Sequence, residues 1–145
     1  MRYVYPALFD EAEGTVIVRF RDLPEAVTEG ATRSDAALEA VECLDAALLF
    51  RLKEGAEVPA PSAAAAGEHV IAASPSVAAK VAFAIAFRAS GRTRVDLAEE
   101  LGLAEGEVRR MLDADHATKI DRLAEGLRRL GVRLSVEAEP AEAAA

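Results

Sequence analysis

The chain has 145 residues, of which 52% are hydrophobic, and it carries 25 acidic against 17 basic side chains, a formal net charge of −8. This length fits one domain or two small ones, and this hydrophobic fraction excludes global disorder. The net negative charge excludes a protein that coats nucleic acid indiscriminately, because that mode of binding needs a broad cationic surface.

Cysteine content and hydropathy indicate the compartment. Cys43 is the single cysteine of the sequence, so no internal disulfide can form. No stretch combines a basic start, an apolar segment and a small-residue cleavage site. The apolar run at 78–87 is shorter than the roughly 20 residues that cross a bilayer. We therefore expect a cytoplasmic protein that does not contact membranes.

Charge is distributed unevenly along the chain. Residues 1–76 carry a net charge of −7, residues 77–134 a net charge of +2, and the remainder a net charge of −3. The Ser-Pro-Ser sequence at 74–76 lies close to this change of sign. We predict a first domain over residues 1–73, a short linker at 74–76, a second domain over residues 77–137, and an acidic, alanine-rich tail at 138–145.

The first domain is predicted to begin with a β-hairpin. The stretch "GTVIVRFRD" alternates its side chains between two faces, as a strand with one buried face does. The preceding "RYVYPALF" is joined to it through the acidic turn "DEAEG", which favours antiparallel pairing. Pro6 cannot donate a hydrogen bond to a ladder, so we expect the first strand to lie at an edge or to contain a bulge.

A third strand, a helix and a fourth strand are predicted next. "AVTEG" gives the third strand, and "TRSD" is typical of a capping box that starts a helix. This helix should end at Gly55. "HVIAA" is a candidate fourth strand, which a right-handed crossover could place parallel to an earlier strand. The α+β order βββαβ matches the opening part of a ribonuclease H-like fold. The predicted apolar stripe of the helix is Leu38, Val41, Leu44, Leu48 and Leu52.

The first domain lacks the pattern of a catalytic centre. Metal-dependent phosphodiester cleavage needs carboxylates that converge from neighbouring strands, whereas Asp10, Glu11 and Glu13 share one turn. His69 and His116 belong to no cluster with the spacing of metal ligands. We therefore predict that the chain is not an enzyme and that it binds no metal and no cofactor.

The second domain is predicted to contain four helices. Ser74 and Pro75 begin an alanine-rich helix that ends near Gly91. "TRVD" predicts a capping box for a short second helix, and Gly102 supplies the left-handed residue that a tight turn after it requires. A third helix follows, and "TKID" predicts another capping box for the fourth. "VRLSVE" at 132–137 is predicted to be a terminal strand.

This order predicts a helix-turn-helix formed by the second and third helices of the domain, in which the third helix reads DNA. Two adjacent arginines on that helix cannot both face inward, and a bidentate arginine–guanine contact is the commonest specific base contact. The alternative is a structural bundle with solvated arginines. Glu105 and Glu107 oppose DNA binding because they place negative charge at the start of the helix. The predicted DNA-contacting residues are Arg92, Thr93, Arg94, Arg109, Arg110 and Lys119.

Two stretches together resemble one known family. "FRDLPEAVTEGATRSDAALEAVECLDAALL" resembles the signature of HicB antitoxins, and "RVDLAEELGLAEGEVRRMLDADHATKIDRLAEGLRRLGVRL" resembles the helix-turn-helix that many of them carry behind it. The resemblance implies an antitoxin whose amino-terminal unit blocks a HicA-type mRNA-cleaving toxin without cleaving RNA itself. It also implies a carboxy-terminal half that dimerises and represses the operon at its own promoter. Toxin contacts are expected at Asp22, Leu23, Pro24 and Glu25.

A homodimer is also expected on physical grounds. One helix-turn-helix reads only a few base pairs, and two linked copies raise affinity through effective concentration. The terminal strand lacks a sequence-near partner and could pair with its copy in a second chain.

Two other functions remain open. One is a stand-alone transcriptional regulator whose first domain senses a ligand or a protein. The other is an active nuclease, which requires magnesium-dependent RNA cleavage that is lost on changing Asp10. A neighbouring gene for a small basic protein would favour the antitoxin.

Overall fold

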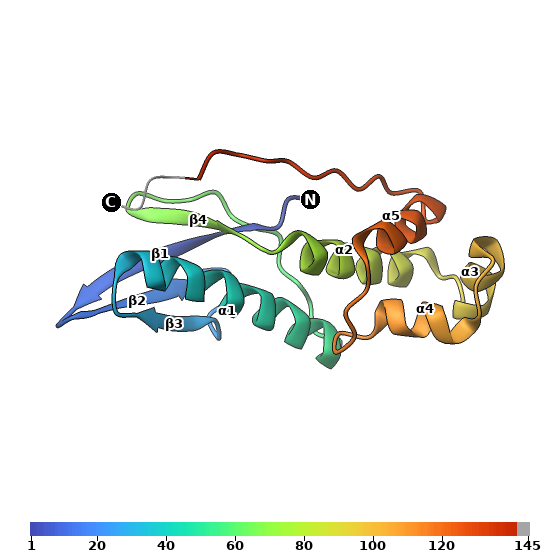
Figure 1. Ribbon diagram of the computed structural model, residues 1–145, viewed down its shortest axis with the longest axis horizontal. Coiled ribbons are helices and arrows are strands. Elements are labelled where there is room, and N and C mark those ends of the chain that lie inside the picture. Colours follow the sequence, from blue (N-terminus) through green and yellow to red (C-terminus); the bar gives the residue numbers. More distant parts are fainter. Residues whose placement is uncertain (142–145) are drawn as a thin grey trace.

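A four-stranded antiparallel sheet and a long helix form one end of the molecule, and four further helices extend to the other end (Figure 1). The computed structural model describes residues 1–141. These elements confirm the predicted α+β class. The elements are β1 (Val4–Ala12), β2 (Thr15–Phe20), β3 (Val27–Gly30), α1 (Arg33–Glu54), β4 (Glu68–Ala72), α2 (Pro75–Ser90), α3 (Arg94–Leu101), α4 (Glu105–Leu112) and α5 (Ile120–Arg129).

The predicted hairpin between β1 and β2 is confirmed, with a tighter turn than expected. Ala12 pairs with Thr15, so the turn consists of Glu13 and Gly14. Both residues have positive φ angles, 41° and 81°, as the two central residues of a type I′ hairpin turn require. Asp10 therefore belongs to the strand and not to the turn.

β1 is a central strand, so the prediction that Pro6 marks a sheet edge is wrong. The sheet order is β3-β2-β1-β4. The ladder between β1 and β2 begins at Ala7 opposite Phe20, directly after Pro6. The donor that proline lacks thus falls at the end of the ladder, where the carbonyl of Pro6 still accepts from Arg21 N at 3.4 Å.

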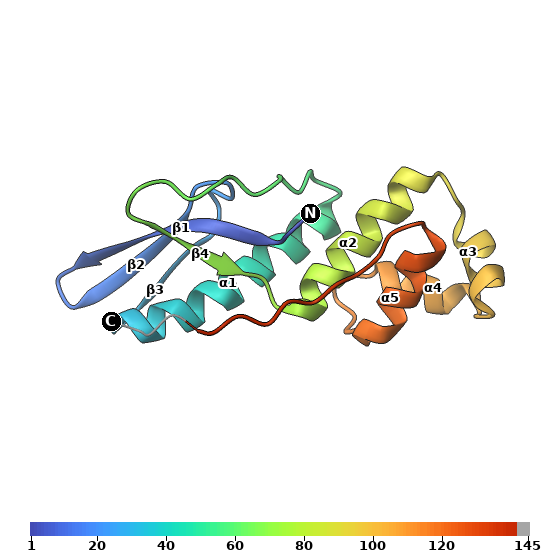
Figure 2. The same ribbon diagram turned by 90° about the horizontal axis from the view of Figure 1, so that it is seen from above.

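β4 runs antiparallel to β1, so the expectation of a parallel crossover is also wrong. Val4 pairs with Ala72 and Leu8 with Glu68. After α1 the chain runs back along the sheet through residues 56–67 before β4 begins (Figure 2). This return reverses the chain direction, and β4 consequently enters the sheet opposite to β1.

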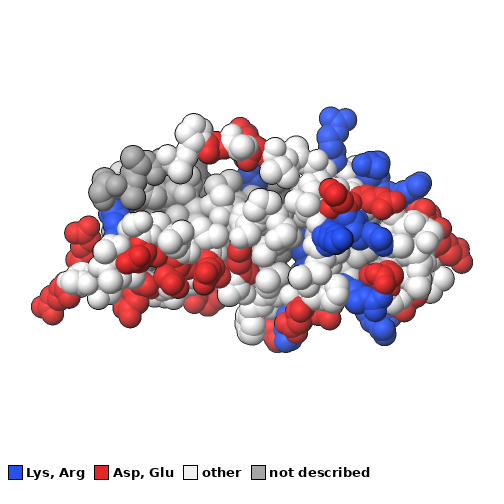
Figure 3. Space-filling model, in the orientation of Figure 1, with Lys and Arg blue, Asp and Glu red and all other residues white. Residues whose placement is uncertain are grey.

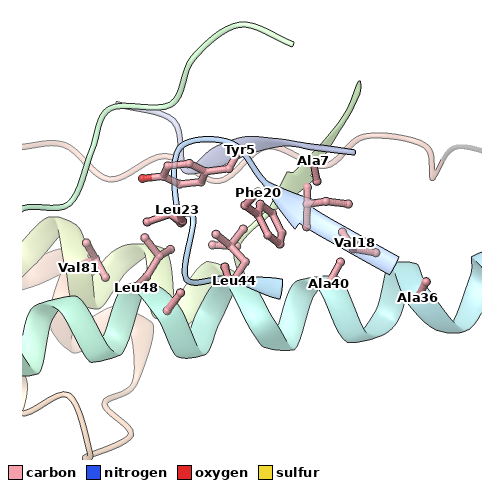
Figure 4. Packing of buried hydrophobic residues seen from close by; sticks show 14 of the residues in the cluster. Tyr5, Ala7, Val18, Phe20, Leu23, Ala36, Ala40, Leu44, Leu48 and Val81 are labelled. Carbon is pink, nitrogen blue, oxygen red and sulfur yellow. The ribbon is translucent and has the colours of Figure 1, made fainter. Parts of the chain in front are cut away.

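α1 covers one face of the sheet and buries small residues against it (Figure 4). The predicted start and end are confirmed, because Thr32 Oγ1 accepts from Asp35 N at 3.1 Å and Gly55 has a φ of 68°. The predicted stripe is wrong at Leu38, which is 69% exposed. Alanines lie at the closest approach of helix and sheet. The buried α1 residues are Ala36, Ala40, Leu44, Ala47, Leu48 and Leu52.

α2 contributes to both hydrophobic clusters of the molecule. Val81 packs in the cluster between the sheet and α1. Ala79 and Phe83 pack in the second cluster, with α3, α4 and α5. The linker predicted at 74–76 overlaps the start of this shared helix, and the division into domains stays a prediction. Ser74 does not cap α2 through its side chain; its backbone N donates to Asp45 Oδ1 at 2.9 Å.

Residues 132–141 form no strand in the single described chain, so the predicted terminal strand at 132–137 is wrong there. The segment is extended and runs back beside α2 toward the sheet (Figures 1 and 2). No sheet of the described part takes up its backbone hydrogen-bonding groups. Of the predicted tail at 138–145, the last four residues lie outside the described residues. None of the described helices has the length and apolar character needed to cross a membrane.

Candidate functional site

α3 and α4 form two eight-residue helices around a short glycine turn. The predicted capping box of α3 is confirmed: Thr93 Oγ1 accepts from Asp96 N at 3.1 Å, and Thr93 N donates to Asp96 Oδ2 at 3.3 Å. Gly102 has a φ of 66°, which glycine adopts without steric cost. The turn therefore changes the direction of the chain within residues 102–104, and α4 begins directly after it.

Apolar contacts fix α4 against its neighbours and leave its other side in solvent. Val108 and Met111 are buried in the second cluster, together with Leu97 of α3 and Leu127 of α5. Gly126 of α5 packs closely against α2, and a Cβ added at this glycine would lie 2.7 Å from the Phe83 ring. This packing gives α4 a buried and a solvent-facing side.

The solvent-facing side of α4 carries the two predicted base-contacting arginines. Arg109 and Arg110 are both exposed. The Arg110 guanidinium pairs with Glu107 one turn earlier on the same helix. Within residues 1–141 no ion pair holds Arg109 or the exposed Lys119, which is the N-cap residue of α5. These two cations are available to an anionic ligand.

The predicted phosphate-contacting arginines are engaged by carboxylates of the chain itself. Arg92 Nη1 lies 2.6 Å from Glu100 Oε2. Arg94 Nε lies 2.9 Å from Glu105 Oε1. The arginines are partly exposed, and surface ion pairs of this kind contribute about 1 kcal/mol or less. A phosphate could therefore replace either carboxylate at small cost.

Sequence reasoning missed Lys80, which is 4% exposed. Its ammonium donates to the carbonyls of Arg110, Met111 and Asp113 and to the Thr118 hydroxyl. Burial lowers the pKa of Lys80, and the nearby Asp113 opposes this shift. The available signal was a lysine inside the otherwise apolar run of α2.

The capping box predicted at Thr118 and Asp121 is wrong. α5 begins at Ile120 behind the N-cap residue Lys119, and its N-cap makes no side-chain hydrogen bond. The Thr118 hydroxyl instead accepts from Lys80 Nζ at 2.9 Å. The hydroxyl oxygen that the local sequence predicts as a helix cap is thus hydrogen-bonded to a lysine of another helix.

The predicted toxin-contacting residues lie in the loop after β2. Asp22 accepts from Ser62 N and Ser62 Oγ, both at 2.7 Å. Glu25 pairs with Arg51 of α1, and this hydrogen bond lowers the pKa of Glu25. Pro24 is exposed.

Leu23 of that loop is 0% exposed and belongs to the core. The prediction that the Leu23 side chain contacts a toxin is therefore wrong, because apolar burial turns this side chain inward, away from any partner.

Acidic side chains dominate the outer side of α1. Asp35, Glu39 and Glu42 are exposed there, and the exposed fractions of Leu38 and Phe50 are 69% and 60%. Figure 3 shows mainly acidic residues over this end of the molecule, whereas Lys and Arg gather over the helical end among further acidic residues. The molecule is electrically polarised along its length.

Titratable groups elsewhere are dispersed. No group of three or more His, Cys, Asp or Glu in residues 1–141 is placed to hold a metal ion. His69 Nε2 lies 2.7 Å from Arg33 Nη2, and the Phe9 ring lies below the same guanidinium. Burial raises the pKa of the Cys43 thiol.

Comparison with known proteins places the chain in a family. A family model described as the HicB-like antitoxin of bacterial toxin–antitoxin systems matches residues 2–82. Antitoxin HicB of Escherichia coli (strain K12) is 36% identical over 133 residues, which cover 91% of this chain and 96% of that protein. Antitoxin HicB 1 of Photorhabdus laumondii is 34% identical over 136 residues, 93% of this chain and 86% of that protein. The chain therefore belongs to the HicB-like antitoxin family.

Proposed function

We propose that this chain neutralises a HicA-type mRNA-cleaving toxin through its sheet and α1, and that it represses its own operon by binding promoter DNA through α4 as a homodimer. It has no catalytic role in this scheme and acts in the cytoplasm. The observation that carries the proposal is the polarity of the molecule, with an acidic end and a separate end that exposes Arg109 and Arg110.

The acidic end suits a cationic partner. A toxin that cleaves RNA must attract a polyanion, so carboxylates can compete for its surface by charge as well as by shape. Exposed carboxylates lie beside exposed Leu38 on α1, which supplies apolar contact area. Asp22, Pro24 and Glu25 remain proposed contact residues, and Glu25 is held beside α1 by its ion pair with Arg51.

The helical end suits the grooves of DNA. α4 is short, follows a tight turn and carries its arginines on the solvent side, which is the arrangement of a recognition helix. Arg109 and Arg110 would contact base edges. The proposed phosphate contacts are Arg92, Thr93, Arg94 and Lys119.

A dimer would use the extended carboxy-terminal segment. Leu134 and Val136 line a groove of about 1400 Å³ between this segment, α2 and β4. Val136 is 64% exposed in the single chain. Pairing with the same segment of a second chain would give the backbone N–H and C=O groups hydrogen-bond partners and would cover the Val136 side chain.

Two assays test the proposal together. The toxin encoded beside this gene should cleave mRNA when alone and lose that activity when this chain is added. Gel-shift titration on the chain's own upstream DNA, at a stated salt concentration, should give a specific complex. DNA binding without a toxin partner would favour the stand-alone regulator instead, and magnesium-dependent RNA cleavage by the purified chain would favour the nuclease.

A further inference from the structure

Lys80 ties the end of α4 to α2. Its Nζ lies 3.2 Å from the Arg110 carbonyl oxygen, 3.1 Å from that of Met111 and 2.9 Å from that of Asp113. A fourth acceptor, Thr118 Oγ1 in the loop before α5, lies at 2.9 Å. One buried ammonium thus contacts the end of α4 and two residues, Asp113 and Thr118, of the connection from α4 to α5.

The ammonium adds a second donor to the Arg110 and Asp113 carbonyls, which also accept from Asp113 N and His116 N, both at 3.2 Å. The last carbonyls of a helix have no partners within the helix, and a cation is favoured at that end by the helix dipole. A buried ammonium in turn costs free energy unless acceptors surround it. Within the described residues, no buried side-chain polar atom is left without a hydrogen bond.

Lys80 itself cannot move far. Its neighbours Ala79 and Val81 are each 0% exposed and pack in different clusters. Both clusters therefore fix the position of α2, and with it the backbone position from which the Lys80 side chain extends. The carbonyl of Arg110 is among its acceptors, so the contact acts on a residue that is itself proposed to read a base.

We propose that Lys80 is the positioning residue of the DNA-reading surface, because it sets the position of α4 on α2 and so aims Arg109 and Arg110 at base edges. This inference rests on the proposed DNA-binding function. Base contacts specify sequence and depend on position, whereas phosphate contacts supply most of the non-specific affinity. Loss of the ammonium should therefore reduce specificity more than overall affinity.

The experiment compares Lys80→Met with Leu130→Ala at one salt concentration and well below the unfolding temperature. Met keeps an unbranched chain of equal length as far as the Cε atom and removes the ammonium with its donors. Leu130, the C-cap residue of α5, is partly buried beside the second cluster and is not one of the hydrogen-bond partners of Lys80. The readout is the ratio of affinities for the chain's upstream DNA and for a scrambled duplex of equal length.

Lys80→Met should lower this ratio about tenfold or more, the discrimination of one bidentate base contact. Its affinity for the scrambled duplex should stay within about twofold of the wild type, and Leu130→Ala should keep the wild-type ratio. An unchanged ratio in Lys80→Met, or an equal loss in Leu130→Ala, would overturn the inference. If the wild type itself does not distinguish the two duplexes, the proposed function fails instead.

Thr118→Val provides a second test if Lys80→Met does not fold. It removes one of the four acceptors and retains the lysine and its three carbonyl partners. We expect the affinity ratio to fall about twofold to threefold, because a single hydrogen bond contributes about 1 kcal/mol or less. A ratio equal to that of the wild type would contradict a positioning role.

Discussion

Arg94 Nε and Glu105 Oε1 lie 2.9 Å apart and link the first residues of α3 and α4. The Glu105 carboxylate thus links the two helices, and it also pairs with the guanidinium of Arg94, which is proposed to bind a phosphate. An acidic chain could thus carry the proposed DNA-reading surface, with Arg92, Arg94 and Arg110 paired to carboxylates of the chain until DNA replaces them.

Glu105→Gln should strengthen binding to the upstream DNA. The substitution frees Arg94 and removes a negative charge from the start of α4. The side chains are 50% and 37% exposed, so the pair contributes about 1 kcal/mol or less, and affinity should rise by up to about fivefold. Glu99→Gln makes the same change in net charge on α3 without releasing an arginine. Equal gains in the two variants would contradict a specific role for the ion pair.

Gly30→Ala should strongly destabilise the packing of α1 on the sheet. A Cβ at Gly30 would lie 2.3 Å from Ala36 N and 2.7 Å from Ala36 Cα, so the backbone of α1 would have to move away from the sheet. Overpacking of this kind costs about 3 kcal/mol or more. Urea unfolding followed by circular dichroism measures the change.

Gly106→Ala should stabilise the protein, in contrast to Gly30→Ala. Its Cβ would come no closer than 3.7 Å, to the Arg109 side chain, and the residue lies inside α4. Alanine is favoured over glycine in a helix by about 1 kcal/mol, so stability should rise. An unchanged stability in Gly30→Ala would contradict the tight approach of α1 to the sheet, and a stability loss in Gly106→Ala would contradict the open surroundings of that position.

Much of the architecture follows from local sequence patterns. Strand alternation, the cap at Thr32, the capping box at Thr93 and the left-handed residues at Gly55 and Gly102 depend on short-range chemistry, and each is found in the structure.

The features that could not be predicted depend on contacts between distant residues. The direction of β4 depends on the path of the long loop after α1. The Thr118 hydroxyl is taken by Lys80, 38 residues earlier in the chain, and Leu23 is buried because the core closes over its loop. For the candidate site, the sequence located the exposed arginines of α4 but not the carboxylates and the lysine that hold this surface in place.

Tyr5 should make the stability of the chain sensitive to alkaline pH. Burial, reinforced by Tyr3 and Asp22, raises the pKa of Tyr5 to about 12 from its ordinary value of 10.0. Between these two values the unfolded chain releases a proton that the folded chain retains, so the free energy of unfolding falls as pH rises.

Tyr5→Phe should flatten this decline. At pH 7 the variant should be about 1 kcal/mol less stable, because the hydroxyl no longer donates to the Pro59 carbonyl at 2.8 Å. Urea unfolding between pH 8 and about 11.5 compares the two proteins. Parallel curves over this range would rule out Tyr5 as the source of the decline.

Val136→Asp should weaken the proposed dimer. Val136 is 64% exposed in the single chain, so the substitution should leave the fold intact, but a carboxylate buried against a second copy is unfavourable. Ser135→Asp adds the same charge at the adjacent exposed residue without removing the apolar side chain of Val136. Sedimentation velocity at micromolar concentration should give a dimer for the wild type and for Ser135→Asp, and a monomer for Val136→Asp. A wild-type monomer, or an unaffected dimer in Val136→Asp, would exclude this pairing.

The separation of the two proposed binding ends is tested most directly by a variant in which Arg109 and Arg110 are both changed to alanine. Its affinity for the upstream DNA and its inhibition of the neighbouring toxin should be measured beside those of the wild type at the same salt concentration. We predict that DNA binding is lost while toxin inhibition stays at the wild-type level, because both arginines lie on α4, far along the chain from the acidic domain. An equal loss of both activities, or unchanged DNA binding, would contradict the account.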